Sequence, residues 1–322
     1  MPSRRDVLLA LAASGAALLR GRGQKLTLSG VGAAARFPMP AGACDCHVHV
    51  FCDPRRFPMS AERTYTPPIA PVESVLAHLH ALGLDRVVIV SASVYGTDNA
   101  CALDAMRTLG ARARGVANVA TDVTVAELDR LGQGGIRGIR LNFETQGVSN
   151  PRVAVERFQQ AAKQAAGQGW HLQVNTRLPI VAAMEEMILG GPVPVVFDHF
   201  AQADPTLGVD QPGFAALVRL LKSGRAYVKI SGAYRLSTRA PDYADVAPLA
   251  RALIAANPER VLWGSDWPHP DSARRPGRLA TDVALPLRVD DARMLDQLAV
   301  WAPEATTRHT ILVDNPARLY GF

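Results

Sequence analysis

The sequence has 322 residues, of which 48% are hydrophobic and 20% charged, as expected for a globular protein with a sizeable core. Its net charge is +6, but the arginines are scattered along the chain and form no basic stripe interleaved with aromatic residues. This distribution argues against nucleic acid as a partner and favours a positive pocket for a small anionic substrate.

The first residues have the order of charge and hydrophobicity found in export signals. Arg4 and Arg5 precede an apolar run over 7–19, and Ala33-Ala-Ala35 offers a cleavage site. The run is too short for a permanent transmembrane helix, so we expect no membrane contact beyond transient export. We interpret 1–35 as a twin-arginine-type signal segment and expect a periplasmic protein. A solvated tail on a cytoplasmic protein is the alternative.

The four cysteines do not form a disulfide-rich scaffold. Cys44 and Cys46 lie on one expected strand and point the same way, which is a poor geometry for a bridge between them. With Cys52 and Cys101, they lack the paired C-x-x-C spacing of a zinc knuckle. We expect the cysteines to be buried small hydrophobic side chains.

From residue 36 to 322 the chain alternates between short apolar runs typical of strands and stretches with helical spacing. Strands are expected over 44–50, 86–93, 114–120, 136–143, 171–176, 193–200, 227–234 and 261–267. Helices are expected over 74–82, 153–167, 179–189, 214–222 and 247–256. Eight apolar strands with helices between them predict a parallel sheet that closes into a single-domain (β/α)8 barrel of the TIM type. An open doubly wound sheet is the alternative. No dinucleotide-binding or Walker motif supports nucleotide binding.

The first strand carries the most distinctive fragment, Asp45-Cys-His-Val-His49. Because side chains alternate along a strand, Asp45 is expected on the same face as His47 and His49, with the cysteines and Val48 on the other face. A strand that directs two imidazoles to one point is a costly way to build a core. The arrangement favours a site that polarises a carbonyl group or holds a cation.

Two later strands end in similar residues. His199 follows the sixth strand, and Asp266 follows the eighth within Gly264-Ser-Asp-Trp-Pro. In a (β/α)8 barrel the carboxyl ends of the strands surround the active site. We therefore expect His47, His49, His199 and Asp266 to meet at one rim.

The remaining histidines are weaker candidates. His269 is read equally well as a substrate contact or as a rim residue bonded to a loop. His78, His80 and His309 lie on helical stretches and are interpreted as surface or packing residues. His171 begins a strand, which places it at the end of the barrel away from the chemistry.

Seven fragments together resemble the amidohydrolase superfamily, in particular its branch of 2-pyrone-4,6-dicarboxylate lactonase-like hydrolases. They are Asp45-Cys-His-Val-His49, Ser91-Ala-Ser-Val-Tyr-Gly-Thr-Asp-Asn99, Gly138-Ile-Arg-Leu-Asn-Phe143, Asp198-His199, Lys229-Ile-Ser-Gly232, Gly264-Ser-Asp-Trp-Pro-His269 and Asn315-Pro-Ala-Arg-Leu-Tyr-Gly-Phe322. The resemblance runs from about Phe37 onward and implies a somewhat distorted barrel that hydrolyses a lactone. Four residues match the family's catalytic positions: His47, His49, His199 and Asp266.

The resemblance also bears on cofactors. Some relatives act without a tightly bound metal, and strand four of this chain offers Arg137 and Arg140 but no lysine at its end. The carboxylated lysine that bridges two metals in binuclear relatives is therefore not expected. We expect either no cofactor or one divalent cation, zinc above all, held by His47, His49, His199 and Asp266.

The expected reaction is the opening of a small anionic lactone. Asp266 would take a proton from water, and the histidines would stabilise the oxyanion directly or through the cation. We expect Arg140 and Arg235 to bind a substrate carboxylate, although rim salt bridges are equally open, and Tyr65 and Ser93 to add hydrogen bonds. Thr145-Gln146-Gly147 stands where the resemblance to dicarboxylate lactonases implies a further basic residue. A monocarboxylate or sugar-acid lactone therefore competes with a dicarboxylate as substrate.

Several other functions stay open. Lactone isomerisation would use the same residues, as would a mononuclear zinc-dependent amidohydrolase or decarboxylase. An exported solute-binding barrel without catalysis is disfavoured by the acid beside three histidines. A homo-oligomer also stays open.

Overall fold

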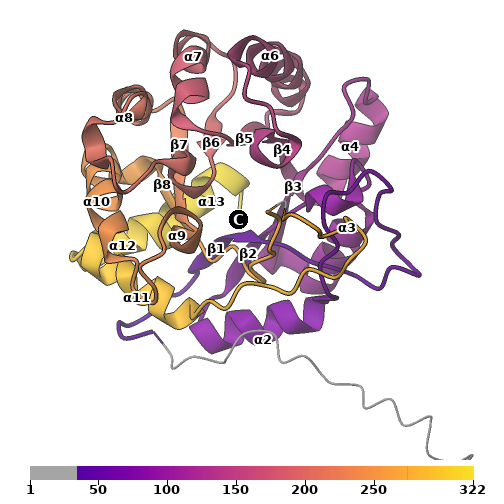
Figure 1. The fold of residues 1–322 in the computed structure, drawn as a ribbon, viewed down its shortest axis with the longest axis horizontal. Coiled ribbons are helices and arrows are strands. Elements are labelled where there is room, and N and C mark those ends of the chain that lie inside the picture. Colours follow the sequence, from indigo (N-terminus) through magenta and orange to yellow (C-terminus); the bar gives the residue numbers. More distant parts are fainter. Residues whose placement is uncertain (1–34, 274) are drawn as a thin grey trace, which may run out of the picture.

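The computed structural model describes residues 35–273 and 275–322, and they form a barrel of eight parallel strands in the order β1 to β8 (Figure 1). An isolated parallel bridge between Val48 and Trp267 joins the first strand to the segment after the last one. The predicted single-domain (β/α)8 barrel is confirmed, and the open doubly wound alternative is wrong. The expected export signal over 1–35 lies, apart from residue 35, outside the described residues.

The strands are short and lie in a ring inside the helices. They are β1 (Cys44–Val48), β2 (Arg86–Val90), β3 (Ala113–Ala117), β4 (Ile136–Asn142), β5 (His171–Asn175), β6 (Val195–Phe197), β7 (Ala226–Ser231) and β8 (Val261–Gly264). Each ends before its predicted end, because the residues that follow turn into loops at one rim of the barrel. We call this rim the mouth.

Helices surround the strands in Figure 1, and the predicted ones occur within two residues of their expected bounds. The longer ones are α2 (Val72–Leu82), α3 (Ala100–Leu109), α4 (Val125–Gln133), α6 (Pro151–Gln168), α7 (Leu178–Leu189), α8 (Phe214–Lys222), α10 (Ala247–Ala256) and α11 (Asp291–Trp301). The short ones are α5 (Phe143–Gln146), α9 (Ala233–Leu236), α12 (Ala305–His309) and α13 (Asn315–Tyr320). Among the described residues, no helix has both the length and the apolar character needed to cross a membrane.

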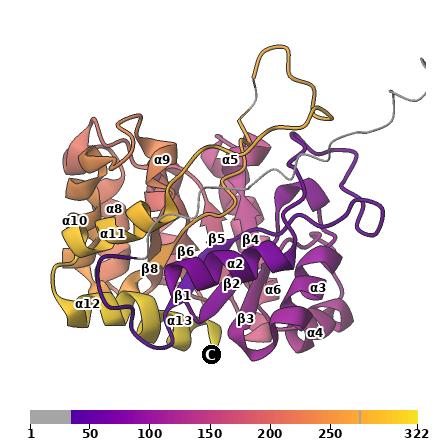
Figure 2. The same ribbon diagram turned by 90° about the horizontal axis from the view of Figure 1, so that it is seen from below.

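Figure 2 shows α5 and α9 at the mouth and α13 at the opposite end of the barrel. Tyr320 of α13 fills that end and packs against interior side chains of several strands, including Val88, Val196 and Leu262. His171 contacts the Tyr320 ring at a centroid distance of 5.2 Å, so it lies at the closed end, away from the mouth, as expected from its place in the sequence.

Strand β1 departs from the regular alternation that the sequence predicts. Its pairing with β2 shifts register between Asp45 and Val48. The Cys44 and Cys46 side chains point into the barrel, in the interior cluster, whereas the Asp45 carboxylate points outward and accepts a hydrogen bond from His78 of α2. The prediction that Asp45 shares a face with His47 and His49 is therefore wrong, because a bulge breaks the two-residue period.

Two of the cysteines form a disulfide. Cys52, in the segment after β1, is bonded to Cys101 of α3, and their Cα atoms are 5.9 Å apart. The interpretation of these two as unbridged hydrophobic side chains is wrong, whereas Cys44 and Cys46 are free and buried as predicted. The pairing residues are separated by 49 positions, so only the fold brings them together.

Candidate active site

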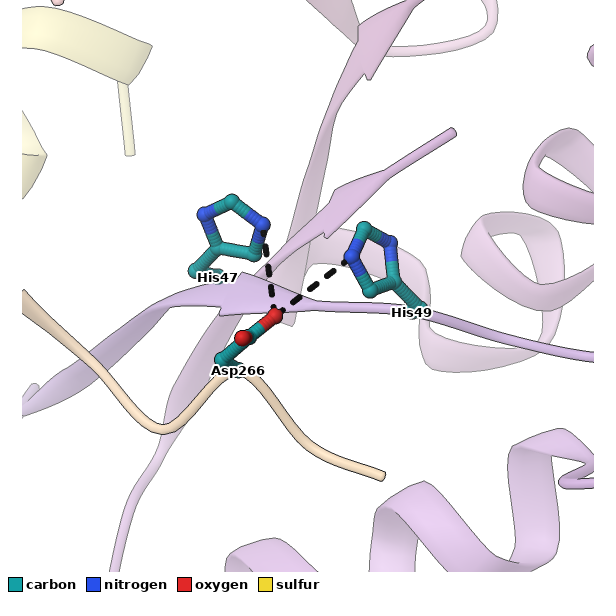
Figure 3. Close-up of side chains that lie close together, drawn as sticks. All are labelled: His47, His49 and Asp266. Atoms are coloured by element: carbon teal, nitrogen blue, oxygen red, sulfur yellow. Dashed lines mark ion pairs between the residues drawn. The ribbon is translucent and has the colours of Figure 1, made fainter. Parts of the chain in front are cut away.

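Two histidines from the first strand and an aspartate from the segment after the last strand form the centre of the mouth. His47 lies in β1, His49 follows it, and Asp266 comes shortly after β8. The Nε2 atoms of His47 and His49 lie 3.7 and 3.6 Å from Oδ1 of Asp266 (Figure 3). All three side chains are buried, so the fold brings distant parts of the sequence to one enclosed point.

The backbone at this point holds β1 and β8 close together. The Asp266 N–H donates to the His47 carbonyl at 2.9 Å, and the His49 N–H donates to the Trp267 carbonyl at 2.8 Å. A Cβ atom on Gly264 would lie 2.8 Å from Cβ of His47, so the close approach requires glycine. Asp266 itself has a left-handed φ of 65°, a conformation that a non-glycine residue keeps only where its surroundings fix it.

The two carboxylate oxygens of Asp266 have different surroundings. Oδ2 accepts hydrogen bonds from the Tyr234 hydroxyl at 2.7 Å and from the Arg235 guanidinium, whereas Oδ1 has no hydrogen-bond partner among the described residues. Burial acts to raise the pKa of Asp266, but the charge of Arg235 and the nearby histidines outweigh it and hold the pKa well below its usual value. The group is therefore ionised at neutral pH, and Oδ1 is the oxygen open to a proton or a cation.

His199 approaches from the other side of the same carboxylate. Its Nε2 lies 3.9 Å from Asp266 Oδ2, and its Nδ1 is 2.9 Å from the Ser231 hydroxyl of β7. The turn His199–Gln202 has left-handed φ at all its residues, none of which is glycine. Such backbone strain occurs where a functional side chain must point in one direction.

A buried polar layer lies beneath His47, and the sequence analysis gave it no role. The Lys229 ammonium of β7 lies 2.7 Å from Gln173 Oε1, 3.4 Å from Asp198 Oδ1 and 3.3 Å from His47 Nδ1. Asp198 Oδ2 also accepts from the Gln173 amide at 3.0 Å. An ammonium group has three N–H donors, and here it has three acceptors within reach. Two features of the sequence point to Lys229: it shares the face of β7 that carries Ser231, and it lies in one of the fragments that resemble the amidohydrolases.

Three histidines of the site, His47, His49 and His199, are neutral at pH 7. Burial lowers the pKa of His199 to about 4. Burial also lowers the pKa of His47 far below its usual value and that of His49 to a lesser degree. Because the Nδ1 atom of His49 lies 2.8 Å from the Val90 carbonyl, Nδ1 carries the proton and Nε2 presents a lone pair toward Asp266.

Comparisons with known proteins agree with this geometry. The sequence profile of the amidohydrolase family matches residues 44–322. The chain belongs to the amidohydrolase family. A 4-sulfomuconolactone hydrolase from Hydrogenophaga intermedia is 35% identical over 289 residues, which cover 89% of this chain and 91% of that protein. A 2-pyrone-4,6-dicarboxylate hydrolase from Comamonas testosteroni is 35% identical over 295 residues, which cover 88% of this chain and 92% of that protein.

A solved structure shares both fold and sequence with this amidohydrolase. A Pseudomonas putida protein described as a 2-pyrone-4,6-dicarboxylic acid hydrolase superposes with a TM-score of 0.73 at 31% identity, covering 88% of this chain and 98% of that one. These relatives confirm the lactonase-like resemblance of the sequence.

The donor atoms of this amidohydrolase fit a divalent cation. His47, His49 and Asp266 offer one ligand atom each within 4.8 Å of one another, and so do His47, Asp198 and His199. The buried Nε2 of His47 and Oδ1 of Asp266 lack hydrogen-bond partners among the described residues. Two imidazoles and a carboxylate are a donor set that zinc accepts at sites with an open position.

The predicted substrate-binding residues lie around this centre. Arg140 is buried, its Nη1 donates to the Ser91 carbonyl at 3.1 Å, and its Nε lies 3.9 Å from Asp198 Oδ2. Arg235 is engaged by Asp266. Tyr65 is buried and Ser93 half-buried, and burial raises the pKa of the Tyr65 phenol.

A cavity of about 760 Å³ lies next to the site, and its wall includes Tyr234 and Arg235, the two residues that hydrogen-bond to Asp266. The lining is mixed in charge, with Arg177, Arg275, Glu144 and Asp271 beside uncharged polar groups. Thr145 and Gln146, at the position where the resemblance implies a further basic residue, are among the uncharged ones.

The other histidines divide into two groups. His80 and His309 are exposed, as predicted. His78 and His269 are buried, and each makes a close contact with a carboxylate. The Nε2 of His269 lies 2.9 Å from Oδ1 of Asp291, the first residue of α11, so the contact observed for His269 is an ion-pair contact with a helix and not a hydrogen bond to a loop.

Proposed function

We propose that this amidohydrolase opens a small anionic lactone by hydrolysis. The observation that carries the proposal is the ionised Asp266 carboxylate: its free oxygen faces two neutral imidazoles, and its partners Tyr234 and Arg235 border a cavity. The two curated relatives compared above are named as hydrolases of lactone-type rings, which supports this class of substrate.

The proposed reaction begins with water next to Oδ1 of Asp266. The carboxylate takes a proton as the water oxygen attacks the lactone carbonyl carbon, and the C–O bond of the ring breaks once the tetrahedral intermediate collapses. The proton then passes to the departing ring oxygen, and the product is a ring-opened carboxylate.

His47 and His199 would stabilise the negative charge that develops on the carbonyl oxygen by donating an N–H, whereas His49, whose Nδ1 proton is bound by the Val90 carbonyl, would do so only through a bound cation. Each is neutral and buried, so hydrogen bonds from the site are made in an environment that excludes water. Removal of one such contact typically costs about 3 kcal/mol in the barrier, or roughly a hundredfold in rate. Arg140 is the guanidinium we assign to the substrate carboxylate, because Arg235 already binds Asp266.

A single divalent cation fits the same centre. His47, His49 and Asp266 would hold it, with His199 nearby. Such an ion would polarise the carbonyl group and lower the pKa of bound water.

The decisive experiment is a panel of lactones assayed by pH-stat, with proton NMR of the products. The panel contains monocarboxylate, dicarboxylate and sugar-acid lactones, each tested after chelation and after addition of zinc. We expect base uptake with at least one lactone. Isomerised product without base uptake would instead identify a lactone isomerase, and no conversion of any lactone would contradict the proposal.

We further propose that the protein works in the periplasm after twin-arginine export. The Cys52–Cys101 disulfide supports this location, because structural disulfides persist mainly in oxidising compartments. Replacing Arg4 and Arg5 together by lysine should leave the protein in the cytoplasmic fraction. Unchanged fractionation of that variant would refute the export proposal.

A further inference from the structure

Four buried ionisable side chains, none of which takes part in the proposed reaction, form one network at the back of the site. We call Asp45, His78, His269 and Asp291 the junction network. The Nε2 of His78 donates to Asp45 Oδ2 at 3.1 Å, and its Nδ1 lies 3.6 Å from Asp291 Oδ2. The other oxygen of Asp291 lies 2.9 Å from His269 Nε2. The network therefore joins α2, β1, α11 and the segment after β8.

The Asp45 carboxylate holds the two strands that carry the site. Its Oδ1 accepts hydrogen bonds from the His47 N–H at 3.1 Å and from the Ser265 N–H at 2.9 Å. The seven neighbouring strand pairs form parallel ladders, two of them with a register shift, whereas β1 is joined to the β8 side only through an isolated bridge between Val48 and Trp267. At this junction a side chain thus supplies part of the hydrogen bonding that a ladder supplies elsewhere.

His78 is placed so that both of its ring nitrogens face carboxylates. A neutral imidazole has one N–H donor, so one of these contacts would lack a proton, whereas an imidazolium serves both. The charged groups that face the ring are Asp45 from β1 and Asp291 from α11, and the uncharged ring of Trp267 lies at a centroid distance of 5.5 Å. Burial acts to lower the pKa of His78, but its two carboxylate partners outweigh that effect and raise it above 6.5.

The backbone near Asp266 needs such support. Asp266 and His269 both have left-handed φ, at 65° and 60°. These conformations are unfavourable for residues other than glycine and persist only where packing and hydrogen bonds enforce them. The junction network contacts this segment from both sides, through Asp45 at Ser265 and through Asp291 at His269.

We propose that His78, held as an imidazolium between Asp45 and Asp291, is a positioning residue that keeps His47 and Asp266 in register for the reaction. It touches neither the substrate nor the reacting atoms. Its catalytic consequence rests on the proposed lactone hydrolysis, whereas its effect on the site geometry does not.

The kinetic test compares His78→Leu with His80→Leu, an exposed histidine on the same helix. We expect kcat to fall by about tenfold or more in His78→Leu with KM changed by less than about threefold, because the substrate contacts are intact. His80→Leu should match the wild type. His78→Gln, whose amide still donates to one carboxylate, should recover part of the loss. A folded His78→Leu enzyme with wild-type kcat overturns the proposal.

A second measurement does not depend on any substrate and works if His78→Leu fails to fold. In histidine-labelled wild-type protein, the imidazole signal that disappears in His78→Gln should titrate with a midpoint above 6.5. The same substitution should shift the His47 and His199 signals and leave the exposed His309 signal in place. A midpoint below 6.5, or unshifted His47 and His199 signals, overturns the proposal even if lactone hydrolysis is confirmed. If no lactone is opened by the wild type, the proposed function fails and these signals still decide the role of His78.

Discussion

Asp266 shows how one side chain is divided between structure and proposed chemistry. Tyr234 and Arg235 occupy one of its oxygens and hold the group ionised, while the other oxygen faces His47 and His49. A carboxylate with both oxygens paired would be a poor base, and one with neither paired would lack a fixed orientation. The arrangement leaves one oxygen for the proton transfer.

Asp266→Asn should reduce kcat by about a hundredfold or more, because an amide cannot accept the proton from water. Turnover of the lactone identified in the panel measures the effect, and circular dichroism checks the fold. Asp122→Asn, at an exposed turn residue, is the matched control and should keep full activity. Retained turnover in folded Asp266→Asn would remove this residue from the mechanism.

The pH profile should show an acid limb near pH 4. His199 has a pKa of about 4, and once protonated it would pair with Asp266 and weaken that carboxylate as a base. Activity should therefore stay level from neutral pH down to about pH 5 and fall below it. Measurement of kcat/KM across this range tests the expectation, and a limb centred between pH 6 and 7 would contradict it.

Lys229 is the buried residue whose removal should matter most for stability. Lys229→Met leaves the Asp198 carboxylate without its ammonium partner, and breaking a buried ion pair typically costs about 3–5 kcal/mol. Urea unfolding measures the loss. Lys163→Met, on the exposed face of α6, should change the unfolding free energy by less than about 0.5 kcal/mol. Equal stabilities of the two variants would show that the charge of Lys229 is dispensable.

The junction between β1 and β8 is the element on which the site depends, and Gly264 makes it possible. Gly264→Ala places a methyl group 2.8 Å from Cβ of His47 and should cost about 1–3 kcal/mol of stability, with a loss of activity as the strands separate. Gly167→Ala in α6 is the control, and it is expected to change stability in the opposite direction. Its Cβ meets nothing within 4 Å, so it should stabilise the helix by about 0.5–1 kcal/mol. Thermal unfolding of both variants tests the contrast.

Much of this element-level arrangement follows from the sequence. The apolar runs and the helical spacing predict the barrel. The positions of His47, His199 and Asp266 at or just after the carboxyl ends of strands predict that these side chains meet at one mouth. The direction of Asp45 does not follow, because the bulge in β1 depends on pairing with β2. The contacts of Lys229 and the Cys52–Cys101 bond could not be predicted from the sequence either, because the partners are far apart along the chain.

At the scale of the whole molecule, the disulfide ties the segment after β1 to α3 outside the barrel. Replacing Cys52 and Cys101 together by serine should lower stability by about 2–4 kcal/mol, because the bond restricts the unfolded chain. Denaturant unfolding measures the loss. Adding reductant should lower the wild-type midpoint and leave the double variant unchanged. A reductant-insensitive wild type would show that the bond adds no stability.

The aromatic ring at the closed end of the barrel also constrains when the protein can fold. Tyr320 comes later in the chain than every strand that it packs against, and it completes the interior of the cylinder. During synthesis, all the strands therefore leave the ribosome before the side chain that fills the space between them. The finished barrel must form after translation of α13, so a nascent chain stalled before that helix would expose an unfilled interior to chaperones.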